Sequence, residues 1–460
     1  MDLENAAELR LGVIGLGHVG LPTALGLADL GWTVIGADAD ENKTKAIASG
    51  NPTFFEPGLD EFLQKQLDSG RFRVTGNVPT AVLESDVISV CVTTPEKQDR
   101  SPDLSQVESV ARIIAANLNG YKLIVEKSTV PVLTANHLKL NINRYTTSKG
   151  MPNSPDNSED GFDVGVNPEF LREGTAIHDF LNPDRIVIGA DSEHGRETLR
   201  TIYRPLIERA HMDENQSVLV TDTRTAEIIK HTSNAFLATK VSFINMVSDL
   251  CDATGGDIEM VARGVGLDPR IGSHFFNAGI GYGGSCLPKD LSAFDGVLKQ
   301  HRINSGLLQE VERINHDRVE RFLGKVKEAM WVVKNKTLAI WGLSFKPNTD
   351  DIRDAPSLKI VKRLLEEGAH LRLHDPRAMD TFVKFFPEDL PKLTYVSSPE
   401  EAAEGADAVL LVTEWPDYLE INLSEIREKM LTPAIVDGRN LFDSRSVRNQ
   451  GFEYFGMGKP

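Results

Sequence analysis

The sequence predicts an α/β protein with two Rossmann-like, doubly wound domains joined by a central domain built on a long helix. A strand, a glycine turn and a helix open the chain, and a comparable succession of strands returns in its last third. Between them, residues 206–254 contain neither glycine nor proline, which is typical of a long helix. Because 460 residues are too many for one hydrophobic core, we expect domains at 1–205, 206–325 and 326–460.

Composition and cysteine usage exclude several classes of protein. With 50 Lys and Arg against 67 Asp and Glu the formal charge is −17, and no segment is basic enough to bind nucleic acid. The three cysteines lack paired spacing, which argues against disulfides and structural zinc. Residues 1–10 lack a signal-peptide pattern, and no later apolar run is long enough to cross a membrane. We expect a cytoplasmic protein without membrane, nucleic-acid or metal partners.

A dinucleotide-binding fingerprint opens the chain. Strand 9–14 leads into a GxGxxG turn and a helical stretch to Leu30, and the next strand, 33–37, ends at Asp38. That acid can accept hydrogen bonds from a ribose diol and would repel a 2′-phosphate, so NAD is favoured over NADP. Lys43 can approach the adenosine side. The alternative is a glycine turn without a cofactor. The candidate cofactor residues of the motif are Gly15, Gly17, Gly20 and Asp38.

Hydroxyl residues follow the strands predicted at 86–92 and 122–126. Ligands collect at the carboxyl ends of parallel strands, so these residues are candidate cofactor contacts, although they are also ordinary turn formers. The residues in question are Thr93, Ser128 and Thr129. Cys91 lies inside the apolar strand and is expected to be a core residue.

Two pairs of polar residues follow in the middle of the chain. Glu169 and Glu173 lie four positions apart in a turn after a strand, where they either meet solvent or face a ligand. Lys230 and Asn234 have helical spacing and share one face of the helix expected from about Thr223. An amine and an amide on that face either end in a salt bridge or reach a ligand.

A glycine-rich segment, 281–290, delivers a cysteine. Three glycines in four positions allow close backbone approach to a bound molecule and lead to Cys286. Lys289 and Asp290 follow within one turn, so a cation and a carboxylate lie near the thiol. Cys286 is therefore a candidate nucleophile, and the alternative is a tight turn around a small buried cysteine.

The last third of the chain repeats the Rossmann pattern without its glycine fingerprint. Strands expected at 337–343, 370–375 and 406–413 match the first, second and fourth strands of the first domain. Ser344–Pro347 replaces the glycine turn and supplies Lys346 as a charge for a different phosphate-bearing ligand.

These features together resemble the UDP-glucose/GDP-mannose dehydrogenase family over about residues 11–443. Segments 268–272, 279–286 and 167–173 are most similar to the branch that oxidises UDP-glucose. The resemblance implies oxidation of a sugar CH₂OH to a carboxylate with two NAD⁺, through a thiohemiacetal and a thioester on Cys286. GDP-mannose and UDP-N-acetylhexosamines remain alternative substrates.

The resemblance also implies roles for individual residues. Lys230 and Asn234 would hold the sugar oxygen and stabilise its negative charge, Asp290 and Thr129 would hold or activate water, and Glu169 would serve the hydrolytic step. The implied cofactor contacts are Val19, Asp38, Lys43, Thr129, Glu173, Lys289 and Arg353. The implied nucleotide-sugar contacts are Glu169, Phe170, Leu171, Arg172, Glu173, Lys230, Asn234, Phe275, Phe276, Asn277, Ala278, Gly279, Gly283 and Lys346, with Arg270 supplied by a partner subunit in a homodimer or higher homo-oligomer.

Two departures and two rival functions accompany this interpretation. Segment 91–95 differs from the usual family pattern, and segment 146–161, expected to be a solvated loop, is longer than usual. As a further nucleotide-sugar contact, Arg439 has a weaker match to the family than the residues above. A two-electron hydroxyacid dehydrogenase would need neither Cys286 nor the second Rossmann-like domain. A non-catalytic NAD-binding protein would not need Lys230, Asn234, Cys286 and Asp290 together.

Overall fold

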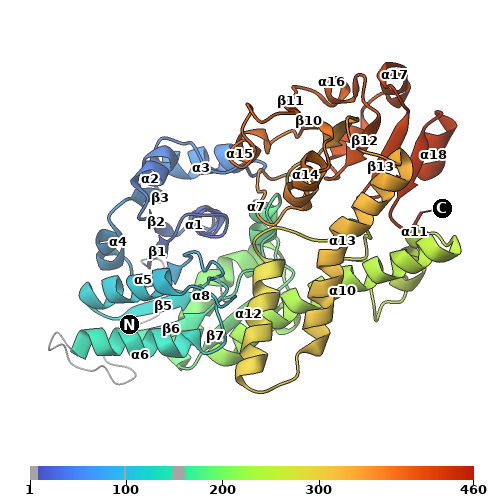
Figure 1. Cartoon of the computed structure of the whole chain (residues 1–460). Coiled ribbons are helices and arrows are strands. Elements are labelled where there is room, and N and C mark those ends of the chain that lie inside the picture. The colour runs from blue at the N-terminus through green and yellow to red at the C-terminus, as the bar shows by residue number, and fades with distance from the viewer. Residues whose placement is uncertain (1–8, 98–99, 148–160, 460) are drawn as a thin grey trace. The chain divides into compact units, whose positions relative to one another are not determined.

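A computed structural model describes residues 9–97, 100–147 and 161–459 (Figure 1). The chain divides into two compact units. Unit 1 comprises Met1–Ser233 with Ser292–Gln300, and unit 2 comprises Asn234–Leu291 with His301–Pro460. Residues 1–8, which make up most of the N-terminal segment without a signal-peptide pattern, lie outside the described residues.

Unit 1 contains an eight-stranded sheet in the order β3-β2-β1-β4-β5-β6-β7-β8. All neighbouring pairs are parallel except β6 and β7, which are antiparallel. The strands are β1 (Arg10–Ile14), β2 (Thr33–Ala37), β3 (Phe72–Thr75), β4 (Val87–Val90), β5 (Lys122–Glu126), β6 (Phe162–Val166), β7 (Ile186–Ala190) and β8 (Val218–Thr221). The first strands and the doubly wound order confirm the predicted Rossmann-like fold, and β4 is shorter than the expected 86–92.

Helices cover both faces of this sheet because its central strands are apolar on both sides. Leu11 and Val13 of β1 pack on one face, whereas Ile14 packs on the other. The helices are α1 (Gly20–Asp29), α2 (Glu41–Ala48), α3 (Leu59–Asp68), α4 (Val78–Glu84), α5 (Ser105–Ala116), α6 (Thr134–Thr147), α7 (Ala176–Leu181), α8 (Glu193–Arg209) and α9 (Glu214–Ser217). The first two residues of the loop expected at 146–161, Thr146 and Thr147, belong to α6. Residues 148–160 lie outside the described residues.

Unit 2 contains a six-stranded parallel sheet in the order β11-β10-β9-β12-β13-β14. Its strands are β9 (Thr337–Trp341), β10 (His370–His374), β11 (Leu393–Tyr395), β12 (Ala408–Leu411), β13 (Ala434–Asp437) and β14 (Glu453–Gly456). Leu338 and Ile340 face one core, and Ala339 and Trp341 face the other. The predicted second Rossmann-like fold is therefore confirmed.

The helices of unit 2 include those of the central segment. They are α11 (Ile258–Gly266), α12 (Leu287–Gln300), α13 (Gly306–Met330), α14 (Pro356–Glu366), α15 (Met379–Phe382), α16 (Pro399–Ala403), the 3₁₀ turn η2 (Pro416–Leu419), α17 (Leu423–Lys429) and α18 (Ser444–Asn449). α12 leaves unit 2 after Leu291. Val319, Phe322 and Val326 of α13 share a core with Leu338 of β9. The boundary that we expect at residue 325 falls inside α13.

The long helix α10 (Thr223–Thr254) begins where the sequence predicts it. Its residues up to Ser233 belong to unit 1 and those from Asn234 to unit 2. In unit 2, large apolar side chains at roughly helical spacing remain exposed on it. They are Phe236, Phe243, Met246 and Leu250.

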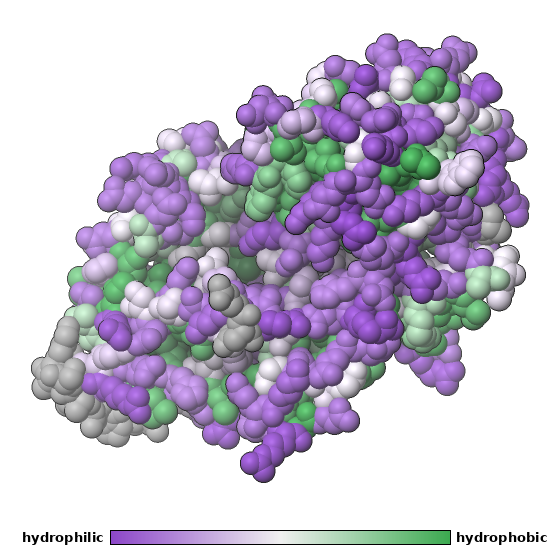
Figure 2. Space-filling view, in the orientation of Figure 1, coloured by the Kyte–Doolittle hydropathy of each residue, from purple (hydrophilic) through white to green (hydrophobic). Residues whose placement is uncertain are grey.

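Hydrophilic side chains cover most of the face drawn in Figure 2, with apolar side chains in separate patches. Within the described ranges, no helix combines the length and apolar character that a membrane span requires.

Candidate active site

The glycine turn after β1 has the geometry of a dinucleotide site. Gly15 has φ +94°, and a Cβ there would lie 2.5 Å from the carbonyl oxygen of Cys91. A Cβ at Gly17 would meet nothing within 4 Å. The turn is therefore packed against the protein at Gly15 and open at Gly17, where a pyrophosphate can approach the start of α1.

Asp38 lies beside this turn as an anchored carboxylate. It accepts hydrogen bonds from the backbone N–H of Leu16 at 2.9 Å and of Asp40 at 3.0 Å, and Lys43 Nζ lies 2.8 Å from its Oδ2. Burial alone would raise the pKa of Asp38, but these hydrogen bonds outweigh it and lower that pKa. The carboxylate is thus charged at neutral pH, as recognition of a ribose diol requires, and the predicted neighbour Lys43 is its ion-pair partner.

The loops after β4 and β5 are tied to each other. Thr94 Oγ1 donates to the carbonyl of Thr129 at 2.8 Å, and Ser128 Oγ donates to that of Val92 at 2.8 Å. Thr93 is exposed beside them. Cys91 is buried, and burial raises the pKa of its thiol to about 12. Its expected place in the core is confirmed.

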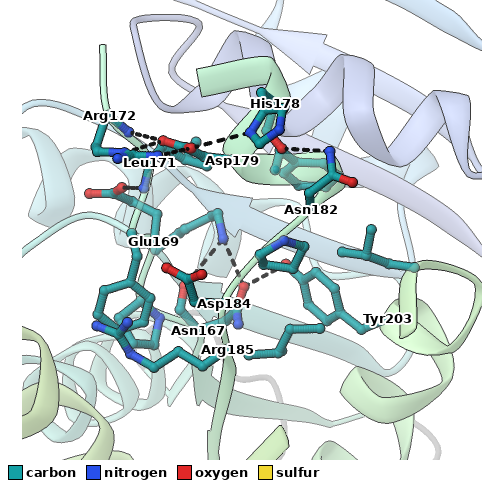
Figure 3. Close-up of a pocket in the computed structure, with 17 residues that line it drawn as sticks. Asn167, Glu169, Leu171, Arg172, His178, Asp179, Asn182, Asp184, Arg185 and Tyr203 are labelled. Carbon is teal, nitrogen blue, oxygen red and sulfur yellow. Dashed lines mark hydrogen bonds and ion pairs between the residues drawn. The ribbon is translucent and has the colours of Figure 1, made fainter. Parts of the chain in front are cut away.

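Glu169 and Lys230 form a buried ion pair in unit 1. Lys230 Nζ lies 2.7 Å from the carbonyl oxygen of Glu169 and 3.0 Å from its Oε1. The backbone N–H of Leu171 donates to the other carboxylate oxygen at 2.6 Å, a contact visible in Figure 3. Both side chains are buried. Lys230 is therefore ion-paired in this structure, and its contact with a ligand stays a prediction. Because burying an ion pair is costly, its presence favours a chemical role over a stabilising one.

The segment after β6 lines a cavity of about 130 Å³ in unit 1 (Figure 3). Asn167 Oδ1 accepts from Lys127 Nζ at 2.8 Å and from the Tyr203 hydroxyl at 2.5 Å. Arg172 makes a two-pronged contact with Asp179, at 2.9 and 2.6 Å. Among the implied sugar contacts 169–173, Glu169 and Arg172 are thus held by residues outside that run.

Cys286 is the exposed thiol of unit 2 and directly precedes α12. Its carbonyl accepts from the N–H of Asp290 at 2.9 Å, and Ser285 Oγ lies 3.7 Å from its sulfur. N–H groups in the first turn of a helix stabilise negative charge, so the position suits a thiolate. The alternative of a buried structural cysteine is wrong.

The carboxylate of Asp290 accepts hydrogen bonds from two other candidate residues, Lys289 and Asn234. It is 1% exposed, its Oδ1 accepts from Lys289 Nζ at 2.7 Å, and its Oδ2 accepts from Asn234 Nδ2 at 2.6 Å. The structure therefore brings five of the candidate catalytic residues together in two subsets. Glu169 and Lys230 form one in unit 1, and Asn234, Asp290 and Cys286 form the other in unit 2. The sixth candidate, Thr129, lies in the loop after β5.

Other implied substrate residues line a separate cavity of about 460 Å³ in unit 2. Phe276, Asn277 and Ala278 contribute to its wall with Arg439. The guanidinium of Arg439 donates to three backbone carbonyls, those of Gly281 at 2.7 Å, Val412 at 2.9 Å and Phe345 at 3.2 Å. Arg439 is therefore a structural contact of this loop in addition to lining the cavity.

The remaining implied residues are placed as follows. Arg353 is exposed and paired with Asp351 at 2.6 Å. Arg270 is paired with Asp268 at 2.6 Å and its side chain is 87% exposed. Lys346 Nζ lies 5.5 Å from the centroid of the Phe345 ring. Val19 and Glu173 are half-buried in unit 1. In unit 2, Phe275 is half-buried, and Gly279 and Gly283 are buried.

Sequence models of one family match most of the chain. The NAD binding domain of the UDP-glucose/GDP-mannose dehydrogenase family matches residues 9–207, its central domain 224–317 and its UDP binding domain 339–444. The chain belongs to this family. NAD is accordingly its cofactor, and the protein is a nucleotide-sugar dehydrogenase.

Individual relatives match over their whole length. UDP-glucose 6-dehydrogenase of Rhizobium meliloti (strain 1021) is 41% identical, with 98% of this chain and 100% of the relative covered. The enzyme of that name from Pseudomonas aeruginosa is also 41% identical, with 98% of both covered. A solved UDP-glucose dehydrogenase from Pyrobaculum islandicum superposes with a TM-score of 0.87 at 34% identity, with 98% of each chain covered. A UDP-D-ManNAc dehydrogenase from Pyrococcus horikoshii gives 0.82 at 28%, with 98% and 99% covered.

Several residues that hold the site of this dehydrogenase in place were not predicted from the sequence. Glu56 is buried and accepts from the N–H of Gly174 at 2.6 Å and of Ala176 at 2.7 Å, next to Glu173. Lys127 and Tyr203 hold Asn167. None of these three residues was singled out in the sequence, because their partners lie far along the chain.

Two buried carboxyl groups also lie in unit 1, on β5 and α10. Burial raises the pKa of Glu126 to about 8, the nearby Glu227 adds to the rise, and Ser128 opposes it. Burial likewise raises the pKa of Glu227 to about 7, against hydrogen bonds from Ala135 and Leu133 at the start of α6. Glu126 is thus largely a neutral acid at pH 7.

We expect Glu126→Gln to raise the free energy of unfolding at pH 8.5 by roughly 4–5 kcal/mol and to leave it unchanged near pH 4. The folded pKa of Glu126 lies above its unfolded value, so between the two the native state holds a proton that the unfolded chain releases, and stability falls as pH rises. Denaturant unfolding at both pH values measures this, with the exposed Glu61→Gln as the control. Equal wild-type and variant stabilities at pH 8.5 would contradict the expectation.

Proposed function

We propose that the protein oxidises UDP-glucose to UDP-glucuronate, in two hydride transfers to NAD⁺ through covalent intermediates on Cys286. The observation that carries the proposal is an exposed thiol at the start of a helix, beside a buried carboxylate held by a lysine and an amide. Full-length relatives at 41% identity that bear the name UDP-glucose 6-dehydrogenase support the choice of sugar.

The proposed reaction balances in four stages. C6 would lose a hydride to NAD⁺, held along the turn 15–20, while the C6 hydroxyl loses its proton, which gives an aldehyde. The thiol of Cys286 adds to C6, forming an S–C bond, and its proton passes to the carbonyl oxygen. A second hydride leaves C6 for a second NAD⁺, giving a thioester and a proton. Water then adds to C6, the S–C bond breaks, and carboxylate, thiol and protons are released. The sum is one CH₂OH, one water and two NAD⁺ consumed, with two NADH and three protons formed.

The proposed catalytic roles follow from charge and hydrogen bonding. Lys230, a buried ammonium, stabilises the oxyanions of the alkoxide and tetrahedral stages together with the amide of Asn234. Glu169, held against Lys230, and Asp290 accept protons when water attacks. Thr129 holds that water. The buried thiol Cys91 takes no part.

Cofactor and substrate contacts are part of the same proposal. NAD would bind along the turn 15–20 with Asp38 on the ribose. The further cofactor contacts are Lys43, Thr93, Thr129, Glu173, Lys289 and Arg353. The nucleotide sugar would bind along 169–173 and 275–279 with Gly283, and Lys346 would neutralise phosphate charge. The three expected domains remain the proposed functional division of the chain.

We also propose a homodimer built on α10. Its exposed apolar residues Phe236 and Leu250 are 65% and 61% exposed, and such a row on a helix is typical of a buried interface. The exposed Arg270 would then complete the site of the partner. A cytoplasmic location is consistent with three cysteines that lie far apart in the sequence and lack paired spacing.

The deciding experiment measures NADH formed per UDP-glucose consumed, with limiting sugar and excess NAD⁺. The covalent scheme requires about two NADH per sugar. A ratio near one would favour a two-electron dehydrogenase. No NADH would reject UDP-glucose, and the same assay with GDP-mannose and UDP-N-acetylhexosamines would then identify the sugar.

A further inference from the structure

The segment that carries Cys286 has no regular secondary structure of its own. From Leu267 to Cys286 the chain forms neither helix nor strand, yet Phe276 and residues 278–281 are buried. Buried backbone N–H and C=O groups require partners. In this segment many of those partners are side chains of other elements of unit 2, so the loop takes its shape from them.

Asn315, on α13, holds the middle of the loop. Its Oδ1 accepts from the N–H of Tyr282 at 2.9 Å, and its Nδ2 donates to the carbonyl of Tyr282 at 3.0 Å. One amide side chain thus supplies the two hydrogen bonds that a neighbouring strand would supply. A Cβ on Gly281 would lie 2.5 Å from the same Oδ1, so the glycine lets the side chain approach.

Arg318, one turn further along α13, holds the beginning of the loop. It is 1% exposed, and its Nε donates to the carbonyl of Gly279 at 2.9 Å. Its other nitrogens lie 2.6 Å from Asp249 Oδ1, 3.1 Å from the carbonyl of Asn245 and 3.1 Å from Ser248 Oγ. A rigid guanidinium can make these contacts together, whereas a lysine ammonium cannot.

Asn245 of α10 closes this arrangement from the other side. Its Oδ1 accepts from the N–H of Gly279 at 2.8 Å, so both backbone groups of Gly279 are held by side chains. Four backbone groups of Gly279 and Tyr282, two in each residue, therefore depend on the three side chains. Cys286 follows Tyr282 by four positions in the same loop, and Gly279 and Gly283 are among the contacts proposed for the nucleotide sugar.

We propose that Asn315 and Arg318 are positioning residues that set the shape of loop 279–286, and thereby the binding of the nucleotide sugar and the reactivity of Cys286. The inference rests on the proposed function for its substrate, but not for the thiol. Their hydrogen bonds reach the backbone of Tyr282 and Gly279. They act through the backbone of the loop.

The first test compares Asn315→Ala with wild type in two measurements. The loss of both Tyr282 contacts should raise KM for UDP-glucose about tenfold or more, with a smaller change in kcat, because substrate binding pays for reordering the loop. Alkylation of Cys286 by iodoacetamide, followed by mass spectrometry without substrate or NAD⁺, should be about threefold slower or more, because the thiol no longer has a fixed place at the start of α12.

The matched control is His316→Ala, because His316 is the next residue on α13 and is exposed. It should leave KM and the alkylation rate unchanged. Equilibrium binding of NAD⁺ and the far-ultraviolet circular dichroism of Asn315→Ala should match wild type, which separates a change in the loop from loss of the fold. Values of KM and alkylation rate within twofold of those of His316→Ala would overturn the proposal.

A second pair of variants, Arg318→Lys and Arg321→Lys, tests the proposal even if Asn315→Ala does not fold. Arg318→Lys keeps the charge beside Asp249 but loses the fork that reaches Gly279, and it should reproduce both effects. Arg321 has a side chain that is 62% exposed and serves as the control. If wild type oxidises no nucleotide sugar, the proposed function fails, and the alkylation rates alone decide whether Asn315 and Arg318 position the loop.

Discussion

Replacing Cys286 with serine is expected to lower steady-state NADH formation with UDP-glucose by about 1,000-fold or more. A serine hydroxyl is a poorer nucleophile than a thiolate, and the ester that it would form resists hydrolysis more than a thioester does. NAD⁺ binding should persist, because the glycine turn and Asp38 lie in unit 1. Steady-state absorbance at 340 nm and titration calorimetry with NAD⁺ measure the two quantities.

The matched control is Cys251→Ala, which removes a buried thiol of the same unit. It should keep turnover close to wild type. Intact-protein mass spectrometry of wild type quenched in acid during turnover should reveal a sugar-nucleotide adduct that Cys286→Ser lacks. Undiminished turnover by Cys286→Ser would eliminate the thioester mechanism, whatever the sugar.

Replacing Lys230 with alanine is expected to lower kcat by about 100- to 10,000-fold. The variant removes the proposed oxyanion partner and leaves the buried carboxylate of Glu169 without its cation. Added ethylamine should restore part of kcat if the ammonium acts on the reacting oxygen. Rate measurements over a series of ethylamine concentrations test this.

Two controls separate chemistry from stability in that experiment. Arg224→Ala removes an exposed cation from the same helix and should change little. Thermal unfolding of Lys230→Ala measures how much stability is lost when Glu169 has no cation beside it. If Lys230 is only structural, ethylamine should restore this stability without restoring kcat. A kcat within tenfold of wild type would remove Lys230 from the mechanism.

The strand skeleton was predictable because buried parallel strands are short apolar runs with polar ends. Strands 33–37 and 122–126 match β2 and β5 residue for residue, and 337–343 contains β9. The glycine turn and its acid were readable for the same reason, since their order and spacing alone define the motif. The expected helix beginning near Thr223 followed from the absence of glycine and proline.

The contacts that shape the site were not predictable in this way. Asn315 and Arg318 have the spacing of an ordinary polar helix face, and only their distant partners distinguish them. The same holds for Glu56, which reaches Gly174 across more than a hundred positions. Pairing across such separations leaves no periodic signal in a single sequence. The residues with chemical functional groups were therefore easier to find than those that hold them.

The reversal of direction between β6 and β7 affects what the chain between them is free to do. If β7 were parallel to β6, the connection would have to cross from one end of the strands to the other before β7 could begin. Because the pair is antiparallel, residues 167–185 leave and rejoin the sheet at the same end of its strands. This is the carboxyl end of the parallel strands, where ligands bind. Part of this connection supports the unit, because Phe180 of α7 packs in the core and Glu56 holds Gly174 and Ala176. Residues 170–172 are at least partly exposed and line the cavity of unit 1. Because these three residues lie outside the sheet, substitutions there can change the chemistry of the cavity without a new fold.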